Sequence, residues 1–287
     1  MLTNLFRLDG NPATVNQGDD FPTLSPREKV SNIIFAEKSW DSISQTKIRE
    51  VEFKDTAFPR SLSRLTFTEC HFEDCLFIGT TFTEVEFHRC KFINCNFWKA
   101  SFRQVYLDPA TIKLGTRFKV EAPNSGISVF QSLLSNFADE RQDQFYIRSD
   151  IQFRKWKRYQ TQSDIRRKRV GIIKGKLNVF SSLFYQYIAG FGYNPGLFFF
   201  YTVVVFLIVS VLNYNIIGES IAVSGSTANG ASFIDTIFYT FSVLTVLGFS
   251  SIVPASPLAK LLTVAEALLA IGWLGIFTSI LVKRFLR

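Results

Sequence analysis

Phenylalanine recurs at every fifth residue through much of the first half of the chain. The row comprises Phe67, Phe72, Phe77, Phe82, Phe87, Phe92, Phe97 and Phe102, continues at Leu107, and has upstream members at Ile48, Phe53 and Phe58. Its register slips between Pro59 and Leu65. A period of five fits neither the 3.6-residue repeat of a helix nor the two-residue repeat of a strand. Repetition at a fixed short period instead predicts a solenoid.

The position two residues before each phenylalanine is equally regular. It holds small or slim residues, which are Cys70, Cys75, Thr80, Val85, Cys90, Cys95, Ala100 and Val105. This pattern resembles the pentapeptide-repeat family, a right-handed quadrilateral β-helix with four pentapeptides per coil. The resemblance covers about residues 47–108. It implies that the phenylalanines and the small residues both point into the coil.

All four cysteines occupy this small position, and so we expect them to be buried and structural. A twenty-residue coil would stack Cys70 under Cys90 and Cys75 under Cys95. Buried free cysteines behave as small hydrophobic residues. The alternative is a metal site, but a spacing of C-x4-C is not that of a zinc knuckle, and we expect no bound metal.

The predicted solenoid is electrically neutral, because residues 48–107 contain eight acidic and eight basic side chains. Some pentapeptide-repeat proteins are strongly acidic and imitate DNA, which a neutral solenoid is not expected to do. Stacked repeats present extended faces. We therefore expect a docking surface for a cytoplasmic protein partner, and no nucleic acid.

Composition divides the chain into five segments. Residues 1–46 lack the apolar core of a signal peptide and are expected to form a loose lead-in to the solenoid at 47–110. Residues 111–176 are predicted to be a basic helical connector. Residues 177–194 place apolar and aromatic side chains at helical spacings, which predicts an amphipathic helix at a membrane interface, with a core helix of the soluble half as the alternative. Residues 195–287 contain two long apolar stretches.

The connector contains the most basic part of the chain. Residues 148–176 carry eleven Lys or Arg side chains and only two Asp side chains. Such a run is typical of nucleic-acid or anionic-lipid binding. Because it stands directly before the first long apolar stretch, we expect anionic lipid to be its partner.

Each of the two apolar stretches is long enough to cross a bilayer. The first is Gly196–Ile217, and the second runs from about Pro257 to Val282 and contains Glu266. No Lys or Arg occurs from residue 177 to residue 259, whereas both flanks are basic. The positive-inside rule therefore predicts a multi-pass protein of the plasma membrane (in bacteria, the inner membrane) with cytoplasmic N- and C-termini.

The loop between the two stretches holds a short apolar segment with Ser232 as its cap, too short to span and therefore predicted to be re-entrant. The order of motifs resembles the two-transmembrane pore module of potassium channels over residues 195–285. Asp235 matches the pore-helix aspartate, Gly248 and Phe249 match the filter glycine and tyrosine, and residues 252–254 match I-V-P. The resemblance implies that Ser251 lies at the pore mouth. It also implies a selectivity filter made of Thr245, Val246, Leu247, Gly248, Phe249 and Ser250.

The filter departs from that family at several positions. Val246 stands where the family has threonine, Leu247 replaces valine, Ser250 replaces the second glycine, and Ser251 replaces the acidic residue. A potassium filter replaces water with stacked carbonyl groups and uses the threonine hydroxyl at its inner end. These losses predict weak potassium selectivity. We expect the channel to conduct several monovalent cations, and the alternative is a channel that conducts anions.

One such module cannot enclose a pore, and closed cyclic symmetry predicts a homotetramer. The second stretch is then the inner helix, and its expected lining and gate residues are Glu266, Gly272, Ile276, Ser279 and Ile280. Glu266 is a functional candidate because ionisable residues are rare within spans, or else it is a satisfied structural partner. Hydrophobic residues near Ile280 are expected to close the cytoplasmic mouth by dewetting.

Taken together, the predicted fold class is a multidomain membrane protein: a quadrilateral β-helix, a helical connector and a two-transmembrane domain with a re-entrant pore loop. The alternative function is a membrane-anchored scaffold that does not conduct ions. We expect no enzymatic activity, because no nucleophile and base stand out together, and no cofactor other than the permeant ions.

Overall fold

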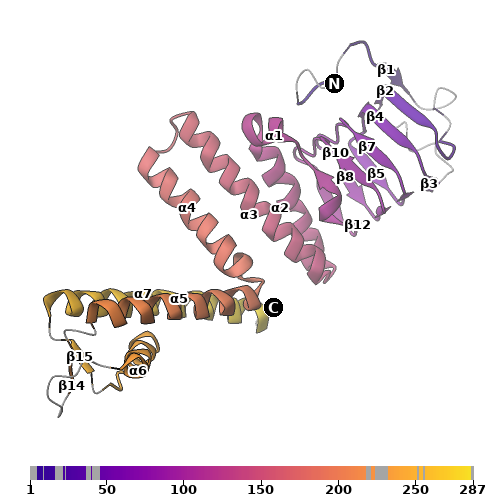
Figure 1. The fold of residues 1–287 in the computed structure, drawn as a ribbon. Helices are drawn as coiled ribbons and strands as arrows, with labels where there is room; N and C mark the ends of the chain where they lie inside the picture. Colours follow the sequence, from indigo (N-terminus) through magenta and orange to yellow (C-terminus); the bar gives the residue numbers. More distant parts are fainter. Residues whose placement is uncertain are drawn as a thin grey trace. The chain divides into compact units, whose positions relative to one another are not determined.

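The computed structural model of the 287-residue chain describes residues 5–8, 10–16, 22, 24–36, 40, 46–217, 221–223, 232–250, 252–254 and 256–285 (Figure 1). The chain divides into two compact units, Met1–Ser182 and Leu183–Arg287. The first unit contains the β-strands of the solenoid, the helices that follow it, and the beginning of the helix Ile172–Ala189. The second contains the apolar helices.

Short parallel strands stack into three sheets in the first unit, and β4, β7 and β10 lie side by side in Figure 1. The first sheet contains β1 (Ala13–Val15), β2 (Lys29–Phe35), β4 (Glu52–Ala57), β7 (His71–Glu73), β10 (Lys91–Ile93) and β13 (Ile112–Lys113). The second contains β5 (Ser61–Ser63), β8 (Thr81–Thr83) and β11 (Ser101–Arg103), and the third contains β3 (Lys47–Arg49), β6 (Thr66–Thr68), β9 (Glu86–His88) and β12 (Tyr106–Leu107). Isolated parallel bridges from Ala57 to Leu76 to Asn96 form the fourth side. The predicted four-sided solenoid is confirmed.

The strand register reproduces the period of the sequence. Phe72 pairs with Phe92, which is twenty residues further along the chain. Phe53 pairs with Phe72 at a separation of nineteen, whereas Leu62 pairs with Phe82 at a separation of twenty. The expected register slip is therefore a deletion of one residue that falls between residues 53 and 62.

Phenylalanine rings fill the interior in vertical stacks. Phe72 is 1% exposed and is stacked between Phe53 and Phe92, at centroid distances of 5.1 and 4.8 Å. Within one coil, successive rings meet edge to face, as Phe67 and Phe72 do at 5.6 Å. Such aromatic pairs contribute roughly 0.5–1.5 kcal/mol beyond the area that they bury.

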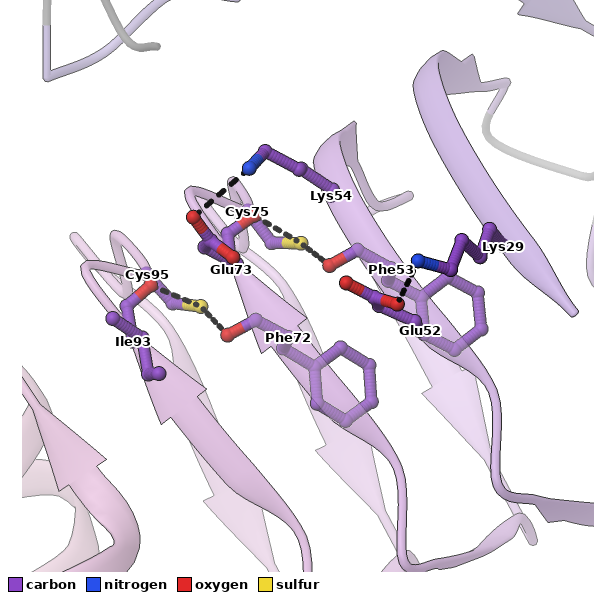
Figure 2. Close-up of polar contacts among 9 residues, drawn as sticks. All are labelled: Lys29, Glu52, Phe53, Lys54, Phe72, Glu73, Cys75, Ile93 and Cys95. Carbon is purple, nitrogen blue, oxygen red and sulfur yellow. Dashed lines mark hydrogen bonds and ion pairs between the residues drawn. The ribbon is translucent and has the colours of Figure 1, made fainter. Parts of the chain in front are cut away.

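All four cysteines are buried in this core, as expected, and are free. Figure 2 shows Cys75, whose thiol lies 3.4 Å from the carbonyl oxygens of both Phe53 and Glu73. Cys95 has the equivalent contacts one coil later, with the carbonyls of Phe72 and Ile93. Burial raises the pKa of the Cys75 thiol well above its usual value. The thiol therefore stays protonated and acts as a hydrogen-bond donor inside the coil.

The segment 1–46, for which we expected a loose lead-in, contributes two strands to the solenoid. β2 pairs with β4 from Lys29 to Ile34, and β1 pairs with β2. Val30 and Phe35 belong to the same buried core as the phenylalanine stacks. These strands have no five-residue phenylalanine row, and the periodic signal therefore missed them.

The helices α1 (Thr116–Glu121), α2 (Pro123–Asp139) and α3 (Asp143–Arg166) follow the last coil. The side chain of Asn136 bonds both backbone groups of Val105: its amide donates to the carbonyl at 2.9 Å and its oxygen accepts from the N–H at 2.9 Å. A helix thereby satisfies polar backbone groups between β11 and β12, at the exposed end of the last coil, where open edges can template association. A Cβ on Gly126 would lie 2.1 Å from the Trp156 ring, so only glycine allows α2 and α3 to pack this closely.

The second unit begins within α4 (Ile172–Ala189) and continues through a 3-10 turn at Gly190–Gly192 to α5 (Pro195–Ile217), β14 (Ile221–Val223), α6 (Phe233–Leu244), β15 (Ile252–Pro254) and α7 (Pro257–Phe285). α4 starts five residues before the amphipathic helix expected at 177–194 and ends at Ala189. One stripe of α4 is exposed at helical spacing, and comprises Ile173, Leu177, Phe180, Phe184 and Tyr187.

We expect Phe72→Ala to destabilise the solenoid by about 3–5 kcal/mol, because it removes a ring from the middle of a stack and leaves a cavity. All four cysteines lie in the solenoid, so thiol labelling of the full chain against urea reports its unfolding specifically. The labelling midpoint should move to lower urea. Ile93→Ala, on the outward side of the next coil, is the matched control and should change stability by about 0.5 kcal/mol or less. Rapid labelling of the unperturbed protein without urea would contradict the buried position of the cysteines.

Candidate functional site

Two helices of the second unit are long and apolar enough to cross a membrane. They are Pro195–Ile216, with a mean hydropathy of 2.4, and Pro257–Lys283, with a mean hydropathy of 1.9. α6 lies between them in sequence and has 12 residues, which is too short to cross. The unit therefore has the composition of two spans and one shorter helix, as expected.

α6 begins with a capping box. The Ser232 hydroxyl accepts a hydrogen bond from the N–H of Ile234 at 3.2 Å, and the Asp235 carboxylate accepts one from the N–H of Ser232 at 3.2 Å. A capping box satisfies N–H groups that have no partner inside the helix. Asp235, expected from the family pattern, thus fixes where α6 starts.

The other end of α6 closes in a Schellman motif. Leu247 donates its N–H to the carbonyl of Ser242 at 3.1 Å, and Val246 donates to Val243 at 3.1 Å. The left-handed position of this motif is usually glycine, but here it is Val246, with φ of 60°. A β-branched residue with positive φ is a strained outlier, and such strain collects at functional sites.

Left-handed backbone alternates through the segment that follows. Val246 has φ of 60° and Gly248 has φ of 70°, whereas Leu247 and Ser250 do not have positive φ. The amides of residues 245–248 donate back into α6, and within the described part of the chain no backbone hydrogen bond reaches the carbonyls of residues 245–250. In the single chain Val246, Leu247 and Phe249 are 59%, 54% and 70% exposed. Ser251 lies outside the described residues.

A buried polar cluster joins the three helices. Asn213 of α5 donates from one amide nitrogen to Thr240 of α6 at 2.9 Å and to Glu266 of α7 at 3.2 Å. Asn213 and Thr240 are 0% exposed and Glu266 is 5% exposed. In an apolar environment, a polar group without a partner is costly, so these bonds favour one arrangement of the three helices. We did not predict Asn213 or Thr240, although an amide in an otherwise apolar span is a readable signal.

Glu266 was expected either to line the pore or to be a satisfied structural partner. Its carboxylate is buried and accepts a hydrogen bond from Asn213 of α5 in the same chain, which fits the second alternative. Among the described residues its Oε1 atom has no hydrogen-bond partner. A second contact nearby, from the Tyr239 hydroxyl to Thr263 at 2.5 Å, also ties α6 to α7.

Only part of the expected inner-helix lining is on an open face of α7. Nothing lies within 4 Å of a Cβ built on Gly272, so that position faces open space. Ile280 is 2% exposed and packs with Ala189 and Phe198, and Ile276 contacts the same cluster. Ser279 bonds Tyr185 at 3.2 Å. Ile280, expected among the lining residues, is thus covered by α4 and α5 in the single chain.

We expect Asn213→Ala to destabilise the second unit by about 1–2 kcal/mol, because it leaves Thr240 and Glu266 without their shared donor. Asn215→Ala is the matched control, since the Asn215 side chain is exposed and bonds only within α5, to the Val211 carbonyl at 2.7 Å. The thermal midpoint in detergent, followed by tryptophan fluorescence, should fall for the first variant and not for the second. Equal midpoints for the two variants would contradict a stabilising role for the cluster.

Comparison with known proteins finds one match in each half of the chain. Residues 200–287 match the family described as ion channel, and residues 67–111 match pentapeptide repeats in nine copies. No curated protein matches the chain. The ion-channel match covers α6, the segment 245–250 and α7, together with most of α5. Together with the two span-length helices, it indicates a membrane protein. Residues 67–111 are therefore similar to pentapeptide repeats, and residues 200–287 are similar to the ion channel family.

Proposed function

We propose that this chain is one subunit of a homotetrameric channel that conducts monovalent cations with weak discrimination between potassium and sodium. The proposal rests on the backbone of residues 245–250. Its φ angle changes sign between successive residues from 245 to 249, and within the described part of the chain no backbone hydrogen bond reaches its carbonyls. Carbonyl groups arranged around an axis can replace the water of a cation. The dipole of α6 also places partial negative charge at the same end of the helix.

Weak selectivity follows from the residues that carry the filter. A valine at position 246 offers no hydroxyl to a dehydrated ion. Ser250, where the related family has its second glycine, does not adopt positive φ, so the alternation ends at Gly248. The proposed filter therefore has fewer ordered oxygen ligands than a potassium filter and leaves ions partly hydrated.

Exposed apolar surface on the second unit supports assembly into a tetramer. α6 exposes Phe238 and Phe241, and α7 exposes Leu268 and Ile271. An apolar hollow of about 300 Å³ opens beside Thr245 and is lined by α5, α6 and α7. In the proposed tetramer, neighbouring subunits and lipid tails cover these surfaces.

We also propose that the chain lies in the plasma membrane with both termini in the cytoplasm, on the charge asymmetry of its flanks. The basic run 148–176 is the proposed contact with anionic lipid. Several of its side chains bind within the first unit instead, as Arg148 does with Asp108 at 2.8 Å and Arg154 with Asp150 at 2.7 Å. Lipid contact is therefore assigned to the exposed Lys168, Lys174 and Lys176. The solenoid is proposed to dock a cytoplasmic protein.

Purified protein in a planar bilayer tests conduction directly. Under a KCl concentration gradient the reversal potential should move toward that of potassium, and with K⁺ on one side and Na⁺ on the other it should lie near zero. A shift toward the chloride potential would favour the anion-permeable alternative. The absence of conductance from folded tetramers would contradict the channel and favour the scaffold.

Restoring the missing ligands should restore selectivity. We expect the double variant Val246→Thr, Ser250→Gly to raise the potassium-to-sodium permeability ratio several-fold, because it supplies the hydroxyl and a residue without Cβ strain. Leu247→Val is the matched control. It also restores a family residue, but valine offers the ion only its backbone carbonyl, which leucine offers as well. That control should leave the ratio unchanged. An unchanged ratio in the double variant would show that these two positions do not set selectivity.

A further inference from the structure

The turn that joins α4 to α5 has an unusual backbone. Three successive residues, Gly190, Phe191 and Gly192, have φ of 54°, 60° and 88°. Phe191 is not glycine, yet it holds this conformation with its side chain only 2% exposed. Strain of this kind persists only where surrounding packing enforces it. Residues 189–194, which we call the elbow, are therefore a built feature of the fold.

The elbow holds the ammonium group of Lys283, near the end of α7. The Lys283 Nζ donates to the carbonyl of Phe191 at 2.6 Å. The same nitrogen lies 4.6 Å from the centre of the Tyr193 ring and 5.8 Å from that of Tyr185. A carbonyl and two aromatic faces form a favourable site for an ammonium ion, particularly where water is partly excluded.

Residues of α7 that precede Lys283 also contact α4. Ser279 bonds the Tyr185 hydroxyl at 3.2 Å, and Ile280 is buried against Ala189. A Cβ on Gly192 would lie 2.6 Å from the Tyr185 hydroxyl and 2.9 Å from Cδ of Lys283, so the close approach requires glycine there. The last turns of α7 thus pack on the side of α4 and α5.

We propose that Lys283 is a positioning residue of the gate, which holds the cytoplasmic end of α7 against the elbow of its own subunit and so favours the open mouth. The proposal rests on the proposed channel, in which α7 is the inner helix and α5 is peripheral. A bond that draws the end of α7 toward α5 draws it away from the pore axis. Because the elbow is the covalent link from α4 to α5, a displacement of α4 reaches α7 through this contact.

Single-channel recording of the full chain tests this role. We expect Lys283→Met and Tyr193→Leu each to lower the ratio of open to closed time about tenfold. Unitary conductance and reversal potential should not change, because Lys283 acts on α7 and not on the permeating ion. Lys283→Arg and Tyr193→Phe, which retain the charge and the ring, should stay close to the unmodified channel.

A double variant distinguishes an effect of the contact between Lys283 and Tyr193 from a general effect of the lysine charge. If Lys283 acts through Tyr193, Lys283→Met with Tyr193→Leu should be no worse than either single variant, since contacting residues are not additive. Lys260→Met, at the opposite end of α7, is the matched control and should leave the open-to-closed ratio unchanged. Additive effects, an altered unitary conductance, or unchanged gating in a channel that conducts would overturn the role of Lys283. The absence of conductance in the unmodified protein would instead overturn the proposed channel, and the gate role with it.

Discussion

A helix of twelve residues cannot cross a bilayer, and the arrangement of the second unit depends on how α6 is kept in an apolar environment. Its N-terminal amides are satisfied by Ser232 and Asp235, and its C-terminal carbonyls by the amides of residues 245–248. Between these ends, Thr240 is bonded to Asn213, which also reaches Glu266. Because backbone without partners is not tolerated against lipid, each of these bonds is a condition for α6 to lie between two spans. The conformation of the proposed filter follows from them, since the Schellman motif that ends α6 also places Val246 in its left-handed conformation.

In the first unit, an unfavourable backbone conformation recurs in every coil. Each coil turns through corners where non-glycine residues take positive φ, as Glu69, Asp74, Glu84 and Arg89 do at 52–57°. Such residues are uncommon, and each costs about 1–2 kcal/mol. The cost is offset because each of these corners is fixed by a strand before it, by a strand or an isolated bridge after it, and by a phenylalanine two residues earlier in the row. None of these corner residues is β-branched, which agrees with the steric limit on left-handed backbone.

The sequence alone predicted the parts of this structure that depend on local period and order. The spacing of phenylalanines established the solenoid and even its one-residue slip, and Ser232 with Asp235 indicated where α6 begins. The N-terminal strands were missed because their pairing with β4 is set by a neighbouring coil and not by their own period. The cover of Ile280 by α4 and α5 was not predicted, because small residues identify a helix face without showing which neighbour covers it. Which helix covers Ile280 depends on the elbow, and the amino-acid composition does not predict the left-handed turn there.

The burial of Glu266 has a consequence for the charge of the proposed pore. A carboxylate that is 5% exposed and bonded to an amide does not act as an acidic ring at the mouth, although its presence in a span suggests one. The sequence of the proposed filter supplies no carboxylate either, since Ser250 and Ser251 stand where the family places glycine and an acidic residue. The proposed preference for cations then rests on carbonyl oxygens and on the α6 dipoles, each equivalent to about half an elementary charge. Partial charges of this size attract cations without distinguishing closely among them, so the proposed weak selectivity is expected from electrostatics as well as from the missing ligands.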